Sequence, residues 1–193
     1  MEISNLKIGL AVTGSFCTLS TILDYIRELS QNAADVVPIF AESVANMDTR
    51  FSPADEITQL IEKITGNTGI KNIQQAERIG PDKMFDILAV IPCTGNTLAK
   101  IALGITDTVV TMAVKSHLRN SRPVVIGASS NDLLGANAKN LGTLLNFKNI
   151  YFVPLFQDDA LNKEKSLSFK PELICKTISK AADGKQLQPL LAR

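Results

Sequence analysis

The sequence predicts an α/β fold of three layers, in which a mostly parallel sheet lies between two layers of helices. Short apolar runs alternate with segments whose apolar residues recur at helical spacing. Four of these runs lead directly into small and polar residues, as strands do where they enter turns. Such alternation is typical of a parallel sheet that is covered on both faces. The chain has 193 residues, and we predict one domain over 1–193.

Five runs are predicted to be strands because they are continuously apolar, which is typical of strands buried on both faces. The first of them reads KIGLAV and precedes a turn that reads TGS. In chain order, the predicted strands are 7–12, 35–41, 85–92, 122–129 and 149–155.

Helices are predicted from the spacing of apolar residues between the strands. The helix at 52–66 has clear ends, because it opens on Ser-Pro-Ala-Asp and stops at Gly66. Thr106 or Asp107 is the expected cap of a later helix. The predicted helices are 18–32, 52–66, 96–105, 106–120, 131–147 and 171–184.

The remaining segments lack a clear period. Residues 42–51 are predicted to be irregular, and 72–81 is too short to assign to a helix or a loop. A polar loop is expected near 157–170, and a tail follows the last helix.

Composition and charge exclude several classes of protein. The net charge is +1 without a long basic block, which argues against nucleic-acid binding through phosphates. The apolar runs are too short to cross a bilayer, and the N-terminus lacks the pattern of a secretory signal. Three widely spaced cysteines predict a reduced, cytoplasmic protein. We expect no metal site, because Asp158 and Asp159 lack a second cluster of carboxylates.

Polar side chains gather at four of the predicted strand ends. They occupy 13–18, 41–46, 92–97 and 128–132. The carboxyl ends of parallel strands meet at one edge of a sheet, and ligands bind there near the point where the strand order reverses. We therefore expect these four turns to form one binding cleft.

The first turn, Thr13-Gly14-Ser15, is a candidate phosphate site. It joins a glycine and two hydroxyls to a predicted helix start, where backbone N–H groups are unpaired and partly positive. The spacing matches neither a P-loop nor a dinucleotide fingerprint. The alternative is an ordinary turn with a serine or threonine cap.

The third turn reads PCTGNT and places Asn96 at a predicted helix start. The amide of Asn96 offers donors and an acceptor, which suit the edge of a flavin ring or a substrate carboxylate. The alternative is that Asn96 or Thr97 only caps the helix. Cys93 has no base nearby in the sequence, so we expect a small buried residue there, and the same for Cys17.

The only histidine, His117, lies near the end of the predicted helix 106–120, where a cation is favoured. We expect it at the surface or in an interface. Lys115, Arg119 and Arg122 form a basic cluster at the same helix end. This cluster is either a solvated face or a contact for an acidic ligand or partner.

Several segments spread over nearly the whole chain are similar to those of one family. They are TGSFCT, TRF, PCTGNTLAKIALGITD, LRNSRPVV, SSNDLLGANAKNL, NIYFVPLFQDD and GKQLQP. On these segments the chain resembles the flavoprotein superfamily of FMN-dependent cysteine decarboxylases and flavin prenyltransferases. The resemblance implies a flavodoxin-like (Rossmann-like) fold, FMN as the cofactor, and a homo-oligomer that is a trimer or a multiple of it.

The same resemblance implies the site residues. The turns after the first and second strands would bind the phosphate, and Asn96 would lie beside the flavin and the substrate as the catalytic residue. The implied cofactor-binding residues are Thr13, Gly14, Ser15, Ser43, Thr94, Gly95, Thr97, Ser129, Ser130 and Asn131.

Within the superfamily, the segments most resemble one component of a two-component oxidoreductase of spore-forming bacteria. The implied reaction oxidises a dihydro intermediate to a pyridine dicarboxylate during sporulation, and the partner component is the candidate site for NADPH. Turn N–H groups, Asn96, and Arg119 or Arg122 are the candidate donors to the two carboxylates.

Two alternatives stay open. Either the chain acts alone as an FMN-dependent decarboxylase or prenyltransferase, or it is a non-catalytic flavin-binding scaffold for its partner. The chain has no histidine between the second strand and PCTGNT, and no cysteine in 155–169. The cysteine decarboxylases carry both, so these departures argue against cysteine decarboxylation.

Overall fold

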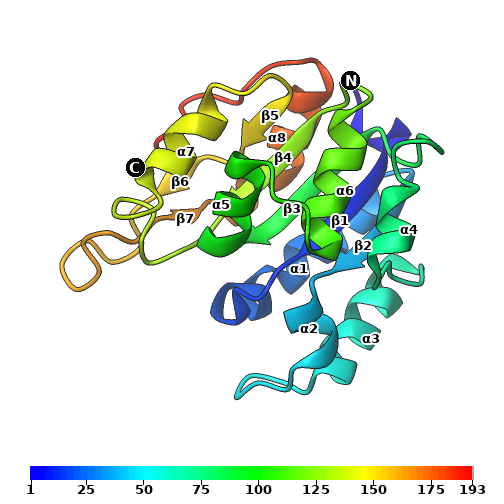
Figure 1. The fold of residues 1–193 in the computed structure, drawn as a ribbon, viewed down its shortest axis with the longest axis horizontal. Helices are drawn as coiled ribbons and strands as arrows, with labels where there is room; N and C mark the ends of the chain where they lie inside the picture. The colour runs from blue at the N-terminus through cyan, green and yellow to red at the C-terminus, as the bar shows by residue number, and fades with distance from the viewer. Residues whose placement is uncertain (193) are drawn as a thin grey trace.

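Five strands form one sheet in which all neighbours are parallel (Figure 1). The computed structural model describes residues 1–192. The order across the sheet is β2-β1-β3-β4-β5, and a separate pair, β6-β7, is antiparallel. The strands are β1 (Lys7–Val12), β2 (Asp35–Phe40), β3 (Ile87–Cys93), β4 (Val124–Ala128), β5 (Ile150–Phe152), β6 (Leu155–Phe156) and β7 (Ser168–Phe169).

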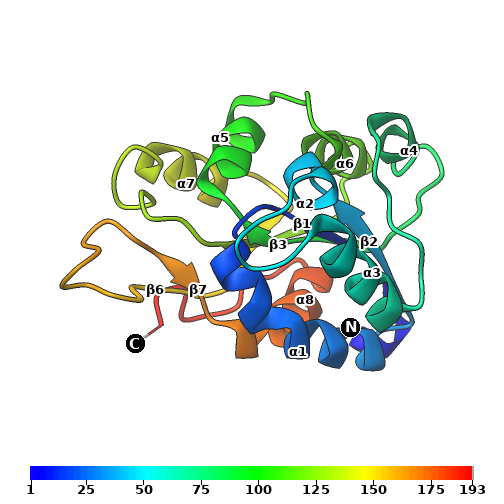
Figure 2. The ribbon, with the colours of Figure 1, turned by 90° about the horizontal axis from the view of Figure 1, so that it is seen from below.

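Helices cover both faces of the sheet. Figure 2 shows α5, α6 and α7 above it, and α1 and α8 below it. This arrangement confirms the predicted three-layer α/β/α, flavodoxin-like fold. The helices are α1 (Phe16–Asn32), α2 (Glu42–Asn46), α3 (Ala54–Thr65), α4 (Ile73–Glu77), α5 (Gly95–Leu103), α6 (Val109–Leu118), α7 (Ala138–Leu145) and α8 (Ile174–Ala182), with short 3-10 turns at Ile3–Asn5 and Pro171–Leu173.

The layers explain the apolar patterns of the sequence. β3 and β4 are buried at every position, because helices pack on both of their faces. A helix instead buries one stripe, which in α1 consists of Leu19, Ile22, Ile26 and Leu29. Each such side chain stabilises the fold by about 1.5–3 kcal/mol relative to an exposed position.

The prediction of an irregular segment over 42–51 is wrong in its first half, because Glu42–Asn46 form α2. Glu42 lies in the first turn of this helix, where a carboxylate is stabilised by the positive end of the helix. Val44 is the one buried residue of α2. A helix with a single buried position shows no period in the sequence, so the pattern could not reveal it.

The predicted helix over 131–147 begins only at Ala138. The Asp132 carboxylate accepts hydrogen bonds from Ser130 Oγ and Asn137 Nδ2, both at 2.7 Å. These bonds hold the segment in turns, since short polar side chains that bond their neighbours compete with helix formation.

The start of α6 also lies later than predicted. Thr108 is the cap in place of Thr106 or Asp107, and it exchanges hydrogen bonds with Thr111 in a capping box. The segment 72–81, unassigned from the sequence, contains α4.

The predicted loop near 157–170 is wrong at its end, because Ser168–Phe169 pair with Leu155–Phe156 as a short hairpin. Phe169 is buried, and burial of its ring favours the return of the chain onto the sheet. The fifth strand is correspondingly shorter than predicted and ends at Phe152.

Both edges of the sheet are occupied by other parts of the chain. Beyond β5, the side-chain amide of Gln186 accepts from Phe152 N at 2.8 Å and donates to Phe152 O at 2.7 Å. Beyond β2, Ile70 donates to Pro38 O and accepts from Phe40 N, each at 2.9 Å. A side chain on one edge and a single residue on the other thus take hydrogen-bonding places that an added strand would use.

Candidate functional site

A cleft opens at the carboxyl edge of the sheet, where the strand order reverses between β1 and β3. Its volume is about 380 Å³, which is within the range of small-molecule sites. The turns after β1, β2 and β3 meet in it. The residues that line it are Thr13, Gly14, Phe16, Ala41, Glu42, Ser43, Met47, Thr94, Asn96, Thr97, Thr108 and Val110.

Thr13 ties the turn after β1 to the turn after β3. Its hydroxyl donates to Pro92 O at 2.7 Å and accepts from Thr94 N at 3.0 Å. The residue is only 1% exposed. The one proton of the hydroxyl is thereby used within the protein, so Thr13 holds the walls of the cleft in place.

The start of α1 offers backbone donors to the cleft. Ser15 occupies the cap position but makes no capping bond with its side chain, and its hydroxyl pairs with Thr18 Oγ1 at 3.0 Å. A Cβ on Gly14 would lie 2.9 Å from Ser43 Oγ, so the turns after β1 and β2 are in close contact. A glycine, two serine hydroxyls and a helix N-terminus therefore converge, which is the chemistry of a phosphate site.

The start of α5 presents Asn96 to the cleft. Thr94 caps this helix by accepting from Thr97 N at 3.3 Å, so Asn96 is not needed as a cap. Asn96 is exposed. Within residues 1–192, no hydrogen bond joins the side chain of Asn96 or Ser43 to another group. Both side chains are therefore available to a ligand.

Two residues of the loop after β4, Ser129 and Asn131, lie in different places. Ser129 Oγ bonds to Thr18 Oγ1 at 2.9 Å, which ties this loop to α1 beside the cleft. Asn131 instead lines a separate hollow with residues 161–165. The structure thus groups Ser129 with the start of α1 and does not bring Asn131 into the cleft.

Gly95, the first residue of α5, packs against the same loop behind the cleft. Ser130 Oγ, Asn137 Nδ2 and Asp132 Oδ1 are the nearest atoms to the position that a Cβ on Gly95 would take. Ser130 donates to Asp132, so its hydroxyl faces the loop. Gly95 and Ser130 therefore shape the cleft from behind.

The cleft is also lined by Phe16, Glu42, Met47 and Thr108, which are not among the site residues predicted from the sequence. Phe16 and Glu42 do lie within two of the turns that were expected to form the cleft. Glu42 is the one charged side chain among the residues that line the cleft. Its Oε1 accepts from Val109 N at 3.0 Å, so a carboxylate already occupies the start of α6. Glu42 has a sequence signal, since it is the first polar residue after a predicted strand, whereas Met47 and Thr108 reach the cleft only through tertiary folding.

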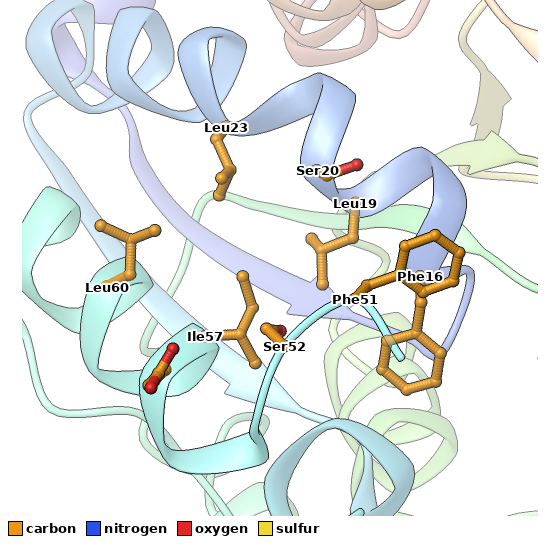
Figure 3. A pocket seen from close by; sticks show the side chains of 9 residues that line it. Phe16, Leu19, Ser20, Leu23, Phe51, Ser52, Ile57 and Leu60 are labelled. Atoms are coloured by element: carbon orange, nitrogen blue, oxygen red, sulfur yellow. The ribbon is translucent and has the colours of Figure 1, made fainter. Parts of the chain in front are cut away.

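A second, mainly apolar hollow adjoins the cleft and lies between α1 and α3 (Figure 3). Its volume is about 180 Å³. Phe16 lines both hollows, so its ring forms part of the wall between them. Phe51 also lines the second hollow, and the guanidinium of Arg50 lies 4.8 Å from the centre of the Phe51 ring.

The basic cluster of Lys115, Arg119 and Arg122 lies at the amino ends of the strands, on the side of the sheet opposite the cleft. α6 runs from the cleft toward the amino ends of the strands, so Lys115 and Arg119 in its last turns lie away from Asn96. Arg122 donates to the carbonyl oxygens of Lys83 and Phe85. The structure therefore contradicts the prediction that Arg119 or Arg122 binds a substrate carboxylate in this cleft.

The prediction of a surface or interface position for His117 is also wrong. The residue is 1% exposed, and Nε2 lies 3.1 Å from Pro123 O. A carbonyl only accepts, so Nε2 carries the proton. The pKa of His117 is lowered from 6.5 to about 4, mainly by burial and also by the nearby charge of Arg122, although the hydrogen bond to Pro123 opposes this shift. His117 is therefore a neutral core residue at neutral pH.

The cysteines differ in accessibility. Cys93 is buried, and burial raises the pKa of its thiol, which confirms the predicted small buried residue. Cys17 is exposed, so the same prediction is wrong there, because Cys17 lies on the outward side of α1.

A thiol reagent added to the folded protein is expected to modify Cys17 and to leave Cys93 unmodified, because only the former thiol is in contact with solvent. Mass spectrometry of the digested protein measures both sites. In urea both cysteines should react. Modification of Cys93 as fast as Cys17 without denaturant would contradict the burial of Cys93.

Within residues 1–192 no group of three His, Cys, Asp or Glu side chains is placed to hold a metal ion. In the same part of the chain, no helix combines the length and apolarity needed to span a membrane.

Comparison with known proteins shows relatives over nearly the whole chain. The flavoprotein family matches residues 1–188. The B subunit of dipicolinate synthase from Bacillus subtilis (strain 168) is 42% identical over 185 residues, which are 96% of this chain and 92% of that protein. The crystal structure of the dipicolinate synthase B subunit from Bacillus halodurans C is similar with a TM-score of 0.91 and 37% identity, covering 100% of this chain and 99% of that chain.

A more distant solved structure shows the fold alone. The FMN-dependent cysteine decarboxylase SpaF is 20% identical and has a TM-score of 0.64 over 93% of this chain and 99% of that chain. The similarity thus extends over nearly the whole fold, sheet and helices alike.

Proposed function

This chain belongs to the flavoprotein family, and from that premise we propose that it works as the B subunit of a dipicolinate synthase. In this proposal it acts with the A subunit of that enzyme in the oxidation of a dihydrodipicolinate-type intermediate to dipicolinate during sporulation. The 42% identity to a dipicolinate synthase B subunit over 96% of the chain supports this assignment over that of the other flavoproteins. The chemistry of the cleft supports the role in binding and oxidation.

One observation carries the proposal: Asn96 and Ser43 face the same cleft, beside the start of α1, where Ser15 makes no capping bond. Neither side chain has a hydrogen-bond partner in the part of the chain that the structure describes. These groups come from three different turns and meet only in the folded chain. A few converging polar groups in a mainly apolar cleft are what orient a small ligand. A purely structural protein that binds no ligand would have no need of this convergence, whereas a flavin-binding scaffold would still require it.

The cleft fits FMN. Its phosphate would be held by the backbone N–H groups at the start of α1 and by the hydroxyls of Ser15 and Ser43. Gly14 leaves open the space that a Cβ would fill next to Ser43. The start of α6 is the less favourable place for an anion, because the Glu42 carboxylate is bonded there. This difference between the two helix starts favours one orientation of FMN, in which the phosphate binds at the start of α1 and the flavin ring lies toward Asn96.

When bound, FMN would supply a two-electron acceptor for the oxidation. The residues of the chain bind and orient the reactants. Asn96 offers Nδ2 as a donor and Oδ1 as an acceptor, and turn N–H groups would donate to a substrate carboxylate. Thr13 keeps two of the turns at a constant separation, so these donors are oriented before the substrate arrives. Phe16 and Val110 give the cleft apolar walls that exclude water.

We further propose that the chain acts in the cytoplasm as a homo-oligomer, a trimer or a multiple of it, bound to the A subunit of dipicolinate synthase. A nicotinamide cofactor on the A subunit is a second candidate for the electron acceptor of the complex, because its oxidised form, NADP⁺, would take the hydride from the substrate and become NADPH. The substrate would be a small dicarboxylate, which the neutral donors of the cleft are suited to bind.

FMN is expected to bind the isolated wild-type chain and to raise its melting temperature, because a ligand that binds only the folded state stabilises it. Riboflavin lacks the phosphate, so it should bind at least about tenfold more weakly, since charge-assisted hydrogen bonds to the phosphate are lost. Fluorescence titration measures both affinities. Equal affinities for FMN and riboflavin would argue against the phosphate site at α1.

Mixing the chain with the A subunit, FMN, NADP⁺ and a dihydrodipicolinate substrate tests the reaction itself. Dipicolinate formation should require both proteins. Full activity of the A subunit alone would reject the catalytic role, and activity of this chain alone would favour the stand-alone alternative.

A further inference from the structure

We propose that Asp132 is a positioning residue for Asn96. A network of polar side chains behind the start of α5 would set where the Asn96 amide stands in the cleft. We call Ser130, Asp132, Asn137 and Asn140 the Asp132 network. The inference rests on the function proposed for the cleft and adds a residue that does not itself touch the ligand.

The Asp132 carboxylate is bonded at both of its oxygens. Oδ1 accepts from Ser130 Oγ and Oδ2 accepts from Asn137 Nδ2, each at 2.7 Å. Asn137 Oδ1 in turn accepts from Asn140 Nδ2 at 2.8 Å. Asn137 and Asn140 are only 9% and 8% exposed. Because each broken bond would leave a poorly solvated polar group, such a network holds its members in one arrangement.

The Asp132 network contacts the residue that precedes Asn96. A Cβ on Gly95 would lie 2.7 Å from Ser130 Oγ, 2.8 Å from Asn137 Nδ2 and 2.9 Å from Asp132 Oδ1. Three atoms of the network therefore fill the space behind Gly95, and only glycine fits there. Since the backbone of Gly95 continues directly into Asn96, an ordered network restricts the position of Asn96.

The charge of Asp132 adds to this effect. A carboxylate beside the first residue of a helix is stabilised by the partial positive charge of that end. The negative charge of Asp132 also makes the start of α5 unfavourable for a phosphate. Asn96 is therefore free to contact the flavin ring or the substrate. Asp132 thus supports both the position of Asn96 and the proposed orientation of FMN, in which the phosphate lies at the start of α1.

Asp132→Ala removes the acceptor of both hydrogen bonds and is expected to loosen the first turn of α5. Hydrogen exchange at the amides of Thr97 to Ala99, followed by mass spectrometry or NMR in the ligand-free protein, should become about tenfold faster. Asp132→Asn keeps one acceptor oxygen and can donate to the Ser130 hydroxyl, so it should restore most of the protection.

Asp35→Ala is the matched control. Asp35 Oδ1 accepts from Asn67 Nδ2 at 2.8 Å, so it forms a similar Asp–Asn pair, but at the amino end of β2. This variant should speed exchange near 35–36 and 65–67 and leave α5 unchanged. Unchanged exchange at α5 in Asp132→Ala, or an equal increase there in Asp35→Ala, would overturn the inference.

Ligand affinity gives the second measurement. Dipicolinate and FMN should each bind Asp132→Ala about tenfold more weakly than the wild type, and Asp35→Ala like the wild type. If the wild-type chain binds neither compound, the proposed function fails, and the exchange measurement still decides whether Asp132 positions α5.

Discussion

Turnover of the assembled enzyme is expected to fall about 100-fold or more when Asn96 is replaced by alanine. Asn96 is exposed in the cleft and has no hydrogen-bond partner for its side chain among residues 1–192, and Thr94 provides the cap of α5. The replacement therefore removes an oriented donor and acceptor but leaves the helix start intact. Loss of one preorganised donor typically lowers kcat about 10²–10³-fold. Steady-state kinetics of the complex with the A subunit should show kcat falling more than KM changes.

Two further variants sharpen this test. Asn96→Asp keeps an acceptor of the same size, loses the donor and adds a negative charge, so it should impair binding of a dicarboxylate more than alanine does. Asn146→Ala changes an exposed asparagine after the last residue of α7, at the opposite edge of the sheet, and should keep full activity. If Asn96→Ala is fully active in the complex, Asn96 has no catalytic role and the scaffold alternative gains support.

The free energy of unfolding is expected to fall by up to about 3 kcal/mol through His117 alone as the pH drops from 7 to 4. The pKa of His117 is about 4 in the folded protein, against an ordinary value of 6.5. The unfolded chain therefore binds the proton more readily than the folded chain does. The contribution of neutral His117 is fully present above pH 6.5 and is lost as the pH falls from there toward 4.

His117→Gln separates this effect from the titration of carboxylates. Glutamine keeps an N–H donor for Pro123 O but does not titrate, while Arg122 and Asp86, which also face His117, are unchanged. Urea unfolding of both proteins between pH 4 and 7 gives the difference in their free energies of unfolding. We expect the wild type to lose about 3 kcal/mol relative to the glutamine variant on acidification. A difference that does not vary with pH would show that His117 has the same pKa in the folded and the unfolded protein.

The regular part of the fold could be predicted from the sequence because burial leaves a period there. β3 and β4 are apolar at every position, and α1 buries every third or fourth residue. The spacing of apolar residues failed to predict the structure in two situations: where polar side chains bond to their neighbours, and where a helix buries only one residue. Asp132 and Asn137 hold turns in a segment that has helical spacing, and α2 has only Val44 buried.

The candidate site could be predicted only in part for a related reason. Gly14, Ser43 and Asn96 follow strands directly, and the parallel sheet brings such turns together at one edge. Asn131 also follows a strand, but the bonds of the loop after β4 direct it to another hollow. The charge of His117 could not be predicted either, because the packing around the end of α6, and not the position on the helix, decides its burial.

The pairing of Gln186 with β5 and of Ile70 with β2 bears on how copies of this chain can meet. Because Gln186 and Ile70 take hydrogen-bonding places on the two outer strands, pairing with a strand of a neighbouring copy is disfavoured there, and we expect an oligomer to assemble through helices and loops. The same contacts protect the folded protein against fibril-like stacking through its edge strands. Truncation after α8 would reopen one flank, and such a shortened chain should accumulate in insoluble material while the intact chain does not.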